Sequence, residues 1–164
     1  MTKYARLGRL YLYSRKPDIE NFMTDGPIKH ITPPEAWEIL QTSPEAVLLD
    51  VRTSMEFEYV GHPMNAINIP WQEAPDWTVN LDFVEKVRKT LAARMGPEAD
   101  IEALPILTIC RSGKRSLTAA EILLKSGFRN VYNIEQGFEG DRDGAKHRST
   151  INGWRHQNLP WEQS

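Results

Sequence analysis

The chain has a single cysteine, Cys110, which begins the stretch CRSGKRS and is followed by three cationic side chains within five positions. An apolar run ends at this cysteine and an alanine- and leucine-rich segment begins at Ser116, which predicts a strand, a short loop and a helix. The N–H groups of a tight loop, the N-terminus of a helix and nearby cations all stabilise negative charge. We therefore expect Cys110 to be a thiolate nucleophile in an anion-binding loop.

The residues that follow the thiol suit the binding of an anion. Arg111, Lys114 and Arg115 contribute full positive charges, and Gly113 allows a turn in which backbone N–H groups face inward. An inert buried cysteine and a solvated basic edge are the alternative interpretations, because free cysteine is often buried and charge runs usually face water. The combination of a thiol, cations and a strand-to-helix position favours a reactive site.

Two reactions use such a loop: attack on the phosphorus of a phosphate ester, and attack on the outer sulfur of a sulfane donor. Cysteine phosphatases carry one residue more between the cysteine and an arginine than this chain does. Here four residues separate Cys110 from Arg115. The smaller loop favours sulfur transfer over phosphoryl transfer, and leaves a cysteine phosphatase or arsenate reductase as a less favoured alternative.

Short apolar runs and helical signals alternate around this loop. The runs predict buried strands at 46–50, 66–70, 105–110 and 130–134. This alternation is typical of an α/β fold with a mainly parallel central sheet and helices on both faces. Ligands bind such sheets beyond the carboxyl ends of the strands, which is where Cys110 is expected.

The helices have recognisable starting signals. Thr32 and Thr53 each precede a glutamate by three residues, Glu35 and Glu56, which is the spacing of a capping box. A third helix is predicted by apolar residues at helical spacing, and a fourth follows from Ser116. The apolar residues of the third helix are Leu81, Val84, Val87 and Leu91.

Length and composition limit the class of protein. With 164 residues, 40% hydrophobic and 26% charged, the chain is expected to form one globular domain at 28–164, preceded by an extension at 1–27. One cysteine makes neither an internal disulfide nor a multi-thiolate zinc site, so we expect no metal and no other cofactor. The five tryptophans are interpreted as packing residues. They are Trp37, Trp71, Trp77, Trp154 and Trp161.

The net charge of −2 gives no overall basic field, so neither nucleic acid nor an anionic membrane is expected as a partner. No apolar run approaches the roughly 18 to 20 residues that cross a bilayer. The basic N-terminal segment lacks the apolar region of a signal peptide. We therefore expect a cytoplasmic location.

Three ordered motifs carry a resemblance to the single-domain rhodaneses, the sulfurtransferases of the rhodanese-homology fold. LLDVRTSMEFEYVGHPMNAINIP resembles the first signature of this family, CRSGKRS its active-site loop, and GFRNVYNIEQGFEG with GWRHQNLPW its C-terminal signature. Two features depart from the family. Asn65 replaces a usual glycine, although asparagine tolerates left-handed backbone, and residues 141–150 form an insertion.

The resemblance implies a sulfurtransferase in which Cys110 takes a sulfane sulfur from a small anionic donor such as thiosulfate. The persulfide would then pass sulfur to a thiol, to cyanide or to a protein. A rhodanese-like module without activity, which binds a protein through the insertion or the extension, is the alternative. The implied site residues are the loop cations Arg111, Lys114 and Arg115, the amides of the loop including Ser112, Gly113 and Ser116, and the supporting residues Asp50 and Arg52.

Overall fold

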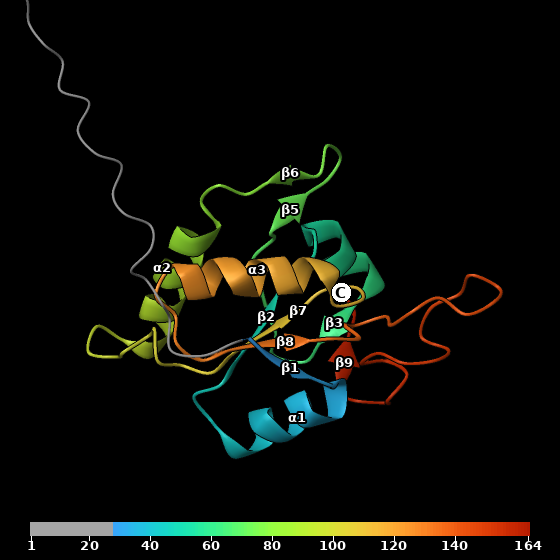
Figure 1. Ribbon diagram of the computed structural model, residues 1–164, viewed down its shortest axis with the longest axis horizontal. Coiled ribbons are helices and arrows are strands. Elements are labelled where there is room, and N and C mark those ends of the chain that lie inside the picture. The colour runs from blue at the N-terminus through green and yellow to red at the C-terminus, as the bar shows by residue number, and fades with distance from the viewer. Residues whose placement is uncertain (1–27) are drawn as a thin grey trace, which may run out of the picture.

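The computed structural model describes residues 28–164 and has a five-stranded sheet at its centre (Figure 1). The strand order is β1-β8-β7-β2-β4, and every neighbouring pair is parallel. The strands are β1 (Lys29–Ile31), β2 (Val47–Asp50), β4 (Ile67–Asn68), β7 (Ile106–Ile109) and β8 (Val131–Ile134). This confirms the predicted α/β fold with a mainly parallel sheet. The predicted extension at 1–27 lies outside the described residues.

Helices cover both faces of the sheet, as predicted. In Figure 1, α1 (Pro33–Thr42) lies on one side, and α2 (Phe83–Met95) and α3 (Lys114–Lys125) lie on the other. Successive strand side chains point to opposite faces, so Leu48 packs on the α1 side whereas Leu49 packs on the α2 and α3 side. Cys110, directly after β7, packs with Leu49 on the α2 and α3 side.

The first and third predicted helices form, with one difference. Thr32 and Glu35 make the predicted capping box at the start of α1, where the Thr32 N–H donates to the Glu35 carboxylate at 2.7 Å. Helix α2 begins at Phe83, so Leu81 lies before it and is 94% exposed. Its place in the apolar stripe was therefore predicted wrongly. The buried face begins at Phe83 and continues at four-residue spacing through Val87 and Leu91.

The predicted helix after Thr53 is present but is wider than an α-helix. One short turn leads into the π-helix η2 (Glu56–Val60). The carbonyl of Phe57, inside η2, contacts the His62 Nδ1 at 3.0 Å, and the two rings stack. These contacts accompany the wider turn and fix the segment against the small antiparallel pair β3 (His62–Pro63) and β9 (Trp161–Glu162).

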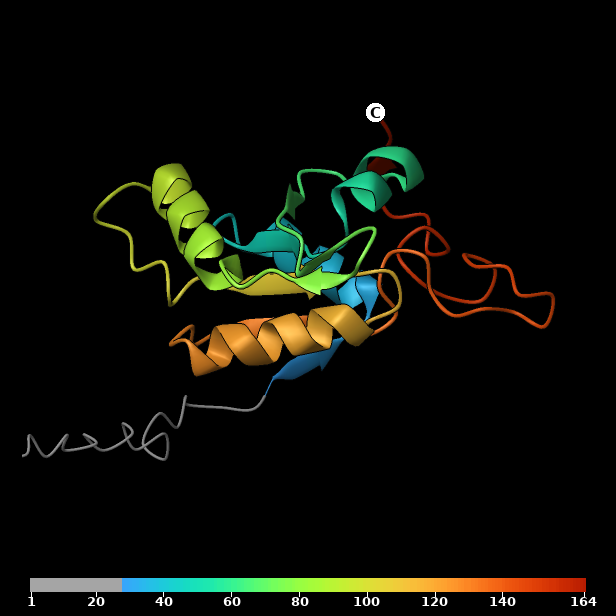
Figure 2. The same ribbon diagram turned by 90° about the horizontal axis from the view of Figure 1, so that it is seen from above.

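Two loops complete the described fold. Asn65 has φ of 64°, the left-handed backbone expected at this departure from the family pattern. The segment 141–150 stands away from the sheet beyond the end of β8 (Figure 2). Asp143 organises it, because its Oδ1 accepts the N–H groups of Ala145 and His147 at 2.9 and 2.8 Å. Within residues 28–164, no helix has both the length and the apolar character needed to cross a membrane.

Candidate functional site

The turn after β7 places Cys110 at the start of a very short loop. Gly113 ends this loop with φ of 91° and is the N-cap of α3, which begins at Lys114, two residues before the predicted start. The left-handed conformation of Gly113 closes the loop early and causes the difference. A Cβ atom at Gly113 would lie 1.8 Å from the Glu135 carbonyl oxygen, so only glycine fits.

Cys110 lines a hollow of about 320 Å³. Cys110 is 1% exposed. Its Sγ accepts the Gly113 N–H at 3.2 Å and lies 3.3 Å from the Ser116 Oγ. The hollow is lined by Trp77, Cys110, Arg111, Ser112, Lys114 and Arg115. Five predicted site residues therefore line it, and two more, Gly113 and Ser116, contact the sulfur.

The cations of the loop concentrate positive charge at the hollow. Lys114 and Arg115 occupy the first turn of α3, where the helix dipole is already positive. Cations at this end of a helix lower the stability of the helix, but here they strengthen the attraction for an anion. The buried Nε of Arg111 has no hydrogen-bond acceptor within residues 28–164. An anion in the hollow would meet three cationic side chains and a helix N-terminus.

Arg115 is held in place by Glu56. Its Nη1 and Nη2 each donate to one oxygen of the Glu56 carboxylate at 2.7 Å. Burial raises the pKa of Glu56, but the hydrogen bonds and charge of Arg115, together with hydrogen bonds from Thr53, outweigh it and lower the pKa to about 2. Burial likewise opposes the charge of Arg115, yet Glu56 raises the pKa of this guanidinium.

Asp50 and Arg52 lie behind the loop rather than in the hollow. Both are fully buried, and the Arg52 Nη2 donates to the Asp50 Oδ2 at 2.6 Å. The Arg52 guanidinium lies 4.4 Å from the centre of the Phe138 ring, and the Phe138 N–H donates to the Cys110 carbonyl at 2.8 Å. This chain of contacts fixes the backbone of Cys110, which fits support and not direct contact with a donor.

Two residues of the site, Glu56 and Trp77, were not predicted from the sequence as site residues. Glu56 was recognised only as part of a capping box, because no feature of the neighbouring sequence indicates that it pairs with Arg115, 59 positions away. Trp77 was interpreted as a packing residue, but it is 48% exposed and forms one wall of the hollow. Its ring centre lies 5.4 Å from the guanidinium carbon of Arg115. No signal in the loop between Trp71 and Leu81 links Trp77 to the thiol.

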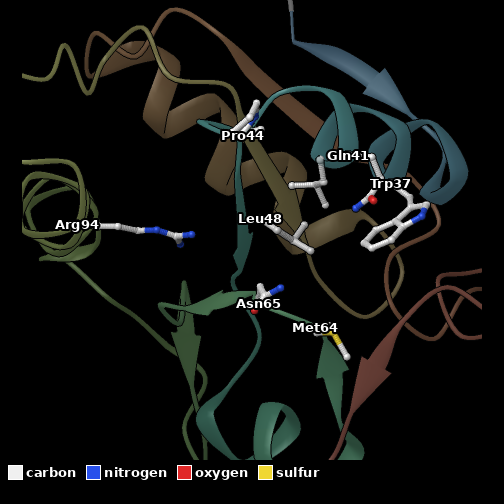
Figure 3. Close-up of a pocket in the computed structure, with 9 residues that line it drawn as sticks. Trp37, Gln41, Pro44, Leu48, Met64, Asn65 and Arg94 are labelled. Atoms are coloured by element: carbon white, nitrogen blue, oxygen red, sulfur yellow. The ribbon is translucent and has the colours of Figure 1, made fainter.

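A second hollow, of about 200 Å³, lies away from the loop (Figure 3). It is lined by Trp37, Leu40, Gln41, Pro44, Ala46, Leu48, Met64, Asn65 and Arg94. None of the predicted site residues borders it. Within the described part of the chain, Cys110 and the loop cations meet only at the first hollow, which makes that hollow the candidate active site.

Comparisons with known proteins show the family of the chain. A model of the rhodanese-like domain family matches residues 32–142. The thiosulfate sulfurtransferase GlpE of Haemophilus influenzae is 33% identical over 114 residues, which cover 70% of this chain and 88% of GlpE. The uncharacterized RP600 homolog of Rickettsia rickettsii is 33% identical over 135 residues, covering 82% and 98% of the two chains. The crystal structure of Rv0390 from M. tuberculosis has a TM-score of 0.72 and 36% identity, and covers 85% of this chain and 100% of that one. The chain therefore belongs to the rhodanese-like domain family.

Proposed function

We propose that the protein is a sulfurtransferase that moves a sulfane sulfur from thiosulfate or a persulfide donor to an acceptor, through a persulfide on Cys110. The observation that carries the proposal is that the single cysteine lines the same hollow as Arg111, Lys114 and Arg115. The name of the relative GlpE, a thiosulfate sulfurtransferase, supports thiosulfate as a donor.

In the first half-reaction the Cys110 thiolate attacks the outer sulfur of thiosulfate. A new S–S bond forms, the S–S bond of thiosulfate breaks, and its electron pair leaves with sulfite. The products are the Cys110 persulfide and sulfite, so charge and atoms balance. Arg111 and Lys114 attract the dianion, and their positive charge stabilises the sulfite that departs.

Arg115 supplies charge from a fixed position, because Glu56 holds its guanidinium at two points. Amides of the loop, Ser112 and Gly113 among them, and of the first turn of α3 at Ser116 would bind the outer sulfur of the persulfide. Asp50 and Arg52 support the loop from behind.

The second half-reaction needs a partner. The chain has one cysteine, so no internal thiol can attack the persulfide. An external thiolate, cyanide or a protein thiol attacks the outer sulfur, and the Cys110 sulfur leaves as a thiolate. A cytoplasmic location, where thiols are kept reduced, remains our prediction.

Intact mass spectrometry tests the enzyme directly. After incubation with thiosulfate and removal of excess donor, the wild-type mass should increase by one sulfur atom, and a small thiol should reverse the increase. Cys110→Ala should gain nothing, and Lys29→Ala, on β1 and outside the hollow, should behave as wild type. An unmodified wild type across thiosulfate and persulfide donors would contradict the proposal.

A protein-interaction module is the second candidate, favoured by one observation. The insertion 141–150 protrudes beside the site, and the N–H groups of Glu139 and Gly140, just before it, donate to the Arg111 carbonyl. If this segment is the functional surface, a chain without residues 141–150 should fail to restore the phenotype of cells that lack the protein. Cys110→Ala should restore it. The reverse pattern supports the enzyme.

A further inference from the structure

One hydroxyl hydrogen behind the candidate nucleophile has two possible acceptors. The Ser116 Oγ lies 3.3 Å from the Cys110 Sγ and 2.7 Å from the Asn133 Oδ1. Ser116, Cys110 and Asn133 are 0%, 1% and 2% exposed, so bulk solvent does not reach these side chains. A serine hydroxyl carries a single hydrogen. The Ser116 hydroxyl can therefore donate its hydrogen bond to the sulfur or to the amide oxygen, but not to both.

Rigid elements hold these three side chains together. Asn133 on β8 lies opposite Thr108 on β7, and Cys110 is two residues beyond Thr108, so their side chains share one face of the sheet. The Thr108 Oγ1 lies 3.0 Å from both the Ser116 carbonyl of α3 and the Tyr132 carbonyl of β8, so the first turn of α3 lies close above that face. The competition for the hydrogen is therefore built into the packing of β7, β8 and α3.

We propose that Asn133 is a positioning residue that keeps the Ser116 hydrogen from the sulfur and so opposes ionisation of Cys110; the inference rests on the sulfur transfer proposed above. When Ser116 donates to Asn133, its oxygen is free to accept the S–H of the protonated thiol. This chain of two hydrogen bonds stabilises the thiol. After ionisation, either the thiolate loses the Ser116 hydrogen bond or the buried Asn133 oxygen loses it, and each loss is costly.

Asn133 thereby counterbalances the groups that favour the thiolate. A cysteine that ionises less readily is a stronger nucleophile once it is ionised, so this contact adjusts reactivity as well as charge. The charged groups around the sulfur are Arg111, Lys114 and Arg115 at the hollow, Glu56 on Arg115, and the pair Asp50 and Arg52 behind the loop. The variants that test the proposal leave all of them in place.

The test is the pH dependence of the rate at which iodoacetamide alkylates Cys110. Asn133→Leu removes the amide at similar volume and releases the Ser116 hydrogen to the sulfur, so the midpoint should fall by about one pH unit. Asn133→Ala should shift the midpoint in the same direction, and this variant replaces Asn133→Leu in the test if the leucine variant does not fold. Asn133→Asp should raise the midpoint, because a carboxylate holds the hydrogen more strongly and adds negative charge.

A double substitution separates this mechanism from a general structural effect. In a Ser116→Ala background there is no hydrogen to share, and Asn133→Leu should move the midpoint by less than about 0.3 pH unit. An unchanged midpoint in both Asn133→Leu and Asn133→Ala, or an equal shift without the Ser116 hydroxyl, overturns the proposal. Alkylation needs no sulfur donor, so its outcome is distinguishable from a failure of the thiosulfate experiment.

Discussion

Two predicted helices of the chain begin with the pattern Thr-x-x-Glu, and these two copies differ in what surrounds them. At the start of α1, the Thr32 N–H and hydroxyl both donate to the Glu35 carboxylate at 2.7 Å. Before η2, the Thr53 N–H and hydroxyl make the same contacts to Glu56 at 3.0 Å. Each carboxylate satisfies backbone groups at a helix start, as a capping box does.

Only the second copy is connected to the candidate active site. Hydrogen bonds from the backbone and then the side chain of Thr32 lower the pKa of Glu35, which has no other partner of this kind among the described residues. The Glu56 side chain is 15% exposed and also binds Arg115 at two points. The same local motif has therefore acquired a second role, which is to hold a cation at the wall of the hollow.

The largest expected effect separates the two glutamates. Glutamine keeps one oxygen for the capping hydrogen bonds. Glu56→Gln removes the negative charge and replaces the other oxygen, which accepts from the Arg115 Nη2, by an NH2 donor, so the largely buried Arg115 loses its ion pair. We expect a loss of about 3 kcal/mol in the free energy of unfolding, at the lower end for a broken buried pair. Persulfide formation from thiosulfate should also slow, because Arg115 is released.

Denaturant unfolding and the rate of sulfur uptake measure these two losses. The matched control is Glu35→Gln, which makes the same chemical change in the exposed copy. Equal losses of stability in the two variants would show that the contact between Glu56 and Arg115 contributes nothing.

Acid titration of stability sharpens the comparison. The pKa of Glu56 is lowered from its ordinary 4.5 to about 2. A carboxylate whose pKa is lowered by folding stabilises the folded state. This contribution is complete at a pH above the pKa of the unfolded state, and it is lost as the pH falls from 4.5 towards 2. After allowance for partial exposure, the loss should be about 2 kcal/mol. Unfolding free energies across this range should therefore decline more steeply in wild type than in Glu56→Gln. Parallel curves would mean that Glu56 is not held by Arg115 in solution.

The two copies also show what the sequence could predict. Both capping boxes were found, because the bonds of a cap span three residues and the two residue types stand at the start of a predicted helix. The strands β2, β4, β7 and β8, the position of Cys110 directly after β7 and the left-handed Asn65 were predicted for the same local reasons, whereas β1 at the edge of the sheet was not predicted. Such features follow from hydrophobic pattern and backbone preference.

The contacts that complete the site could not be predicted in this way. Glu56 meets Arg115 because η2 and the first turn of α3 converge at one edge, and Trp77 reaches the hollow from a loop without a regular pattern. Asn133 reaches Ser116 because β8 pairs with β7 in a particular register. Each contact depends on how distant elements pack, which the sequence of either partner does not specify.

The smallest expected effect is that of Glu35→Gln. The exposed carboxylate has water as an alternative partner, and glutamine preserves the hydrogen bonds to Thr32 at the start of α1. The melting temperature should fall by less than in Glu56→Gln, and sulfur uptake from thiosulfate should equal that of wild type, since α1 lies on the sheet face opposite Cys110. Thermal unfolding and intact mass measure both quantities on one preparation. A loss of sulfur uptake in Glu35→Gln would show that the first capping box also influences the thiol, and the distinction between the two copies would then be wrong.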